Sequence, residues 1–159
     1  MKTWKRYMLT GGLGLLLLLV ILMALLMASG GRRDANIDPA ISHLFYPSLT
    51  LLILGAAGVA VAIILAAYLV MRSISHNILE RYTVKVLRIM GHSCFFSFLI
   101  IVISLVYLGF ALPPGYGGPW GFWFLMALLA CLTAALAFYF LGNLISDAVD
   151  YREENELTV

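Results

Sequence analysis

Charged residues are scarce in this sequence. Asp, Glu, Lys and Arg make up 11% of its 159 residues, whereas apolar residues make up 63%. Soluble domains contain about 25% charged residues, so the composition excludes an ordinary soluble domain. All four charged residue types are absent from four stretches: residues 8–29, 49–71, 89–112 and 120–145. Because a bilayer core about 30 Å thick needs roughly 20 apolar residues per helix, we predict four membrane spans.

The missing charges also exclude several chemistries. Catalysis and proton transfer inside a membrane need ionisable or metal-binding groups within the spans. His92 is the only such group in the spans, apart from cysteine and tyrosine, and no second His or carboxylate is spaced to join it. Neither an HExxH motif nor a phosphate-binding Gly-rich loop occurs. We therefore expect no catalytic residues, no metal site, no cofactor and no enzymatic activity.

Cysteine is nearly absent as well. The two cysteines, Cys94 and Cys131, lie in different apolar stretches. Their expected depths in the membrane differ, and a disulfide needs Cα atoms within about 7 Å of each other. We interpret both as small core residues rather than as a disulfide or a redox pair.

The few cations that are present predict the orientation. Lys and Arg stay on the cytosolic side of a membrane. If both termini are cytosolic, eight Lys and Arg residues lie on that side: three in the N-terminus, four in the connector at residues 72–88 and one in the tail. The remaining loops contain two. We therefore predict a single all-α domain, residues 1–159, in the cell membrane: a four-helix bundle with N and C termini cytosolic. Its exterior loops are residues 30–48 and 113–119, and its acidic tail is residues 146–159.

The connector has two faces. Tyr82 and Val86 belong to an apolar stripe with fourth-residue spacing, whereas Arg81, Lys85 and Arg88 lie on the opposite side. This pattern fits a helix at the headgroup boundary, or helical extensions of the flanking spans, with the cations near anionic lipid. A helix that binds a partner protein would show the same pattern.

Small residues in the second span predict close helix packing. They are Gly55, Gly58, Ala62 and Ala66. Such a strip lets another helix approach closely, and that helix could belong to the same chain, to a second copy in a homo-oligomer, or to a larger membrane complex.

Polar residues in the third span share one face. At 100° per residue, an arc of about 80° contains them: Ser93, Ser97, Ser104 and Tyr107. The fourth span has its own strip at fourth-residue spacing: Ala127, Cys131, Ala135, Tyr139 and Asn143. We expect the two faces to pack together. The hydroxyl groups would bond a neighbouring helix or their own backbone, or else line a path for a polar ligand.

Two expected cytosolic segments carry a resemblance. The tail, residues 150–159, reads DYREENELTV, and residues 84–89 of the connector read VKVLRI. Both resemble a four-span membrane family of bacteria and archaea, domain of unknown function 2975, whose members tend to end in an acidic stretch followed by Leu-Thr-Val or Leu-Thr-Ile.

The family has no established activity, but the resemblance implies a partner. Its members are commonly encoded beside a small helix-turn-helix regulator, so this chain would hold or modulate such a protein without binding nucleic acid itself. Glu153, Glu154 and Glu156 would attract it, and Leu157 and Val159 would add apolar contact. The alternatives are a solvated tail without a partner, a carrier of lipid or small apolar molecules, and an accessory subunit of a larger complex.

Overall fold

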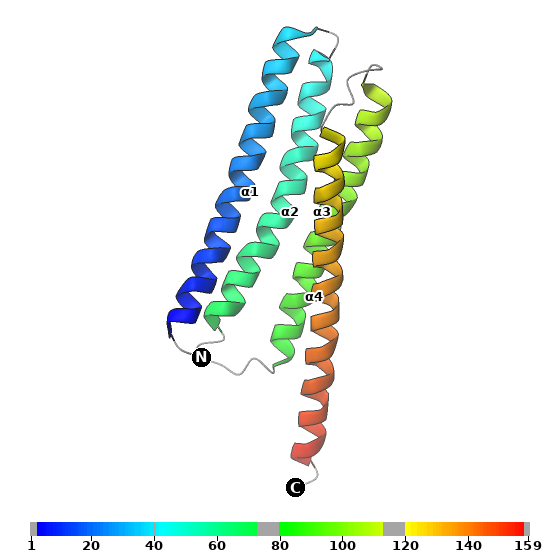
Figure 1. The fold of residues 1–159 in the computed structure, drawn as a ribbon. Helices are drawn as coiled ribbons and strands as arrows, with labels where there is room; N and C mark the ends of the chain where they lie inside the picture. Colours follow the sequence, from blue (N-terminus) through cyan, green and yellow to red (C-terminus); the bar gives the residue numbers. More distant parts are fainter. Residues whose placement is uncertain (1–2, 40, 73–79, 113–119, 158–159) are drawn as a thin grey trace.

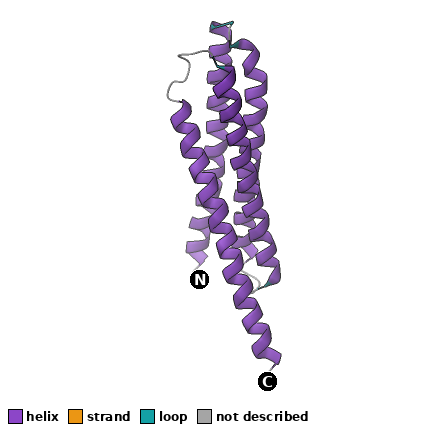
Figure 2. Ribbon diagram, turned by 90° about the vertical axis from the view of Figure 1, so that its right-hand side faces the viewer, coloured by secondary structure: helices purple, strands orange, loops and turns teal. Residues whose placement is uncertain are grey.

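The computed structural model of this chain contains helices joined by short turns, and no strand, in the residues that it describes, 3–39, 41–72, 80–112 and 120–157 (Figures 1 and 2). The elements are α1 (Thr3–Ile37), the short 3-10 helix η1 (Ser42–Leu44), α2 (Phe45–Arg72), α3 (Arg81–Ala111) and α4 (Trp120–Leu157). Each of the four long helices contains an apolar segment long enough to cross a membrane. The predicted fold class, an all-α multi-pass membrane protein, is confirmed.

Prolines account for several helix ends. Helix α1 ends at Ile37, two residues before Pro39, and α3 ends at Ala111. Leu112 is extended, with ψ of 136°, as the residue before a proline usually is. Pro47 lies in the first turn of α2, where its missing N–H has no helical partner to lose.

All four long helices are longer than the predicted spans, and three of them extend well beyond. Helix α1 continues through residues 30–37, which we had assigned to an exterior loop, because a glycine costs only about 1 kcal/mol in a helix. Helix α3 begins at Arg81, so the second half of the connector is a helical extension. Helix α4 continues twelve residues beyond position 145, about 18 Å at 1.5 Å per residue, and includes most of the predicted tail.

The helices pack mainly in chain order, α1 on α2, α2 on α3 and α3 on α4. Helix α3 is the centre of the core, where Met90 is 2% exposed and Cys94 packs near Ala135 of α4 and Ala62 of α2. No residue in the apolar segment of α1 is buried, and most of its leucines are exposed. Both termini lie at the same end of the bundle as the connector (Figure 1). We call this the connector end, and the other the turn end.

The small residues of α2 pack against α3 of the same chain. Gly55, Gly58 and Ala62 are buried there, and Ala66 packs against the core. A Cβ atom on Gly58 would lie 2.9 Å from the Ser93 carbonyl oxygen, which is too close for the backbone to accept. Because α3 covers this strip, it is not a surface for a second copy or another subunit.

The polar face of α3 meets a different helix from the one we predicted. Ser97 is fully buried and donates a hydrogen bond of 2.8 Å to the Gly55 carbonyl oxygen of α2. Helix α4 instead packs through Cys131, Ala135 and Tyr139 against another side of α3, where the Tyr139 ring covers Gly91. Because the α2 glycines have no side chains, α2 can pack closely against the face of α3 that carries the serines.

Candidate functional site

An arginine at the connector end ties α2 to α3. The Arg72 guanidinium pairs with Glu80 at 3.4 Å and lies 4.0 Å over the Tyr82 ring. It also donates a 3.4 Å hydrogen bond to the Tyr68 hydroxyl. Arg72 therefore holds α2 and the start of α3 together, in addition to contributing to the predicted membrane orientation.

A second arginine ties α3 to the extension of α4. Arg81 donates hydrogen bonds to both carboxylate oxygens of Glu153, at 3.0 and 2.6 Å, and pairs with Asp150 at 3.5 Å. Val149, one turn earlier on α4, is buried. The first part of the tail is thus packed on α3, whereas we had expected its carboxylates to be available to a partner.

The ion pair shifts both ionisation equilibria. Arg81 and Glu153 lie outside the predicted spans, and the hydrogen bond from Arg81 lowers the pKa of Glu153 while Glu153 raises that of Arg81. A carboxyl group with a lowered pKa stabilises the fold above its ordinary value of about 4.3. That contribution is lost as the pH falls through the lower folded value. The pair is therefore intact at neutral pH.

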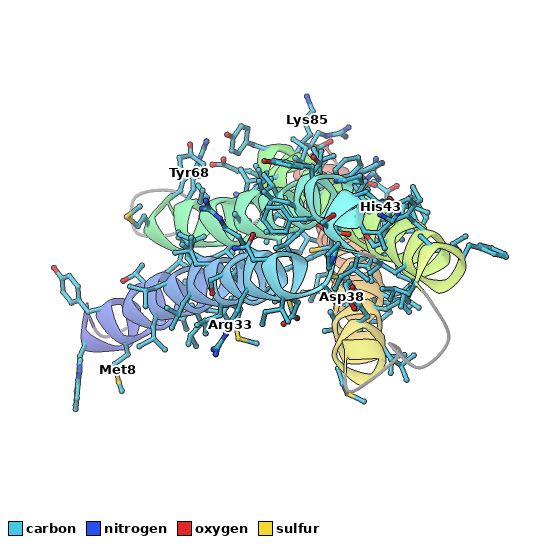
Figure 3. The ribbon with its side chains drawn as sticks, turned by 90° about the horizontal axis from the view of Figure 1, so that it is seen from above. Met8, Arg33, Asp38, His43, Tyr68 and Lys85 are labelled. Carbon is cyan, nitrogen blue, oxygen red and sulfur yellow. The ribbon has the colours of Figure 1, made fainter. Side chains whose placement is uncertain are left out.

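The other predicted cations lie on the surface. Lys85 and Arg88 are exposed, and Lys85 points away from the bundle (Figure 3). No ion pair among the described residues involves either of them. They remain candidates for contact with lipid headgroups or a partner protein.

The extension of α4 presents an acidic face to solvent. Asp147, Asp150 and Glu154 are exposed and follow each other at helical spacings of three and four residues. In Figure 1 this end of α4 projects beyond the other three helices. The remaining tail candidates, the Glu156 and Leu157 side chains and Val159, lie outside the described structure.

The predicted polar face is only partly internal. Ser97 and Ser104 are buried, and each donates a hydrogen bond to the carbonyl oxygen four residues earlier, Ser93 and Ile100. Tyr107 and Tyr139 are half-buried, whereas Asn143 is exposed and does not join the face. An open groove passes over Ser93 and Gly58 beside it. The hydroxyl groups therefore serve helix packing rather than a closed ligand path.

His92 and the two cysteines are the remaining candidate groups of the spans. The Nδ1 atom of His92 lies 2.6 Å from the Arg88 carbonyl oxygen, and its ring contacts that of Tyr139 edge to face. No group of three His, Cys, Asp or Glu residues in the described part of the chain could hold a metal ion. Cys94 and Cys131 are both free and buried.

A cavity at the turn end did not follow from the sequence analysis. It has a volume of about 200 Å³ and is lined by residues from all four long helices, with Asp34 and Ser48 among apolar side chains. The sequence predicts an exterior loop at residues 30–48. The cavity depends on how the ends of four helices pack together, and no sequence signal indicates that packing.

Comparison with known proteins gives a family without an assigned activity. Searches of curated proteins and of solved structures gave no match. Residues 29–159 match the family model described as protein of unknown function (DUF2975), so the matched region begins near the end of α1 and includes α2, α3 and α4. The match covers most of the chain and agrees with the resemblance of its tail and connector: the chain belongs to the DUF2975 family.

Proposed function

We propose that this chain is a non-enzymatic regulatory protein of the cell membrane whose connector end faces the cytosol and binds a basic cytosolic protein. The observation that supports this most directly is the extension of α4, which remains helical to Leu157 and projects past the bundle (Figure 1). An α-helix outside the bilayer offers a rigid surface, so less conformational entropy is lost on binding than with a disordered tail.

The charge on this surface indicates the partner's chemistry. Asp147, Asp150 and Glu154 give the exposed side of the extension a negative character, and Tyr151 is exposed beside them. Asp150 and Glu153 also pair with Arg81, at 3.5 and 2.6 Å, whereas Asp147 and Glu154 take no part in the ion pair with Arg81. An acidic helix with an aromatic side chain complements a basic protein surface, and charge complementarity raises the association rate. The resemblance to this family implies a small helix-turn-helix regulator as the partner, and a protein that binds DNA presents a basic surface to the phosphates.

The test uses charge removal, because deleting the tail would also break the contacts with Arg81. A double variant, Asp147→Asn with Glu154→Gln, would be co-expressed with the neighbouring helix-turn-helix regulator, and the regulator in the membrane fraction would be measured. We expect recovery to fall by about fivefold or more, since losing two favourable charge contacts costs roughly 1 kcal/mol or more.

A matched control removes the same charge at the other end of the bundle. Asp34→Asn with Asp38→Asn changes the net charge equally but lies at the turn end. Recovery of the regulator with this control should equal that of the unmodified protein. Equal recovery with the α4 double variant as well would show that the acidic face is not the binding surface.

A further inference from the structure

The turn-end cavity lies where the ends of the four long helices converge. Its apolar walls come from Met27 of α1, Leu52 of α2, Leu108 and Leu112 near the end of α3, and Phe124 of α4. It lies at the opposite end of the bundle from the acidic extension, so a ligand site here is independent of the proposed function.

The size of the cavity limits what can enter it. An apolar cavity of about 150 Å³ in a protein interior stays dry and accepts benzene. At about 200 Å³, this cavity has room for a somewhat larger group, such as a phenyl ring with a short alkyl chain. Both chains of a phospholipid would not fit.

The polar lining is concentrated in two residues, Asp34 and Ser48. The Ser48 hydroxyl donates its hydrogen to the Leu44 carbonyl oxygen at 2.7 Å, so it has no proton to offer a ligand. Asp34 is one of the lining residues and is exposed, and none of the ion pairs among the described residues involves it. Arg33 points away from the bundle and does not neutralise this carboxylate by contact (Figure 3). The lining thus offers hydrogen-bond acceptors and a negative charge.

We propose that this cavity binds a small amphiphilic amine, with the apolar group held between the four helix ends and the ammonium group beside the Asp34 carboxylate. The apolar contact supplies most of the affinity, since it removes the apolar surface of the ligand from water. The carboxylate selects for positive charge. Its exposure limits that preference to roughly two- to fivefold over a neutral analogue.

The experiment measures saturable binding of 4-phenylbutylamine to the purified full-length protein in phosphatidylcholine nanodiscs, with 4-phenylbutanol as the neutral probe. Ala28→Phe fills the cavity from α1, and Asp34→Asn removes the charge. Leu25→Phe is the matched control, because it makes a bulky change on the same helix at a side chain that is 62% exposed. Ser48→Leu fills the cavity from α2 and replaces Ala28→Phe if that variant does not fold.

The unmodified protein and Leu25→Phe should bind the amine alike, whereas filling the cavity should weaken binding by about tenfold or more. Asp34→Asn should bind the amine only as well as it binds the alcohol. Equal binding by the filled and unmodified proteins would overturn the proposal, as would an absence of saturable binding. Phospholipid could instead co-purify with the unmodified protein but not with Ala28→Phe, while neither protein binds the amine. That result would show that the cavity holds a lipid chain, and it would overturn the proposal.

Discussion

Gly58 and Ser97 show how single residues determine the packing of this bundle. Inside a membrane, helices do not gain hydrophobic free energy by leaving lipid, so close contact and hydrogen bonds hold them together. The missing side chain of Gly58 brings α2 against the α3 backbone, and the Ser97 hydroxyl then reaches the Gly55 carbonyl oxygen at 2.8 Å. The burial of Ser97 and its hydrogen bond therefore follow from the glycines of α2 that face it.

We predict that Gly58→Ala lowers the stability of the protein, although alanine favours helix formation. The new methyl group would contact the Ser93 carbonyl oxygen, and overpacking of this kind costs about 1–3 kcal/mol. Thermal unfolding in detergent measures the effect. Gly109→Ala is the matched control on α3, because a Cβ atom there meets nothing within 4 Å. A melting temperature for Gly58→Ala as high as that of Gly109→Ala would contradict the close crossing.

At the scale of whole elements, α4 differs most from expectation. Its apolar segment crosses the membrane, and the same helix then continues as the acidic extension. Buried Val149 and the pairing of Arg81 with Asp150 and Glu153 hold this extension against α3. Exposed ion pairs contribute little to stability because water and salt screen them, so a binding partner can compete for these contacts.

We predict that Arg81→Gln loosens the extension of α4 without unfolding the bundle. A cysteine introduced by Val149→Cys, in a background with Cys94 and Cys131 replaced by alanine, should react faster with a maleimide once Arg81 is removed. The expected increase is about two- to fivefold, in line with the small free energy of an exposed pair.

Arg88→Gln is the control for this measurement, because it removes the same charge from the same helix and no ion pair among the described residues involves Arg88. Its rate of labelling should match that of the parent protein. If Arg81→Gln labels no faster than Arg88→Gln, Val149 is held by apolar packing alone and the ion pair does not restrain the extension.

The whole molecule has two ends of different chemistry. The connector end contains both termini, the paired arginines and the acidic extension, and the turn end contains the cavity (Figure 1). The excess of Lys and Arg at the connector end predicts that this end faces the cytosol. A turn-end ligand would then reach the protein from outside the cell and a connector-end partner from inside.

We predict that the two ends label from opposite sides of the membrane. In a protein whose two native cysteines are replaced, a membrane-impermeant maleimide should modify Ile37→Cys in intact cells, since Ile37 is exposed at the turn end. Lys85→Cys should react only after the cells are permeabilised. The reverse labelling pattern would show that the orientation is opposite to the predicted one, and it would contradict the proposed cytosolic partner.

The number of spans and the absence of charge within them follow from the sequence alone, and the sequence also predicts the orientation, because each depends on transfer of residues between water and lipid. The tertiary structure decided which faces meet: that Ser97 lies against α2, that Arg81 binds Glu153 of α4, and that the ends of four helices line an open cavity that includes Asp34. Lipid and a neighbouring helix are equally apolar, so hydrophobic patterning inside a membrane does not mark the inward face of a helix. Steric fit and hydrogen bonding between particular side chains mark it instead, and these depend on the positions of all four helices.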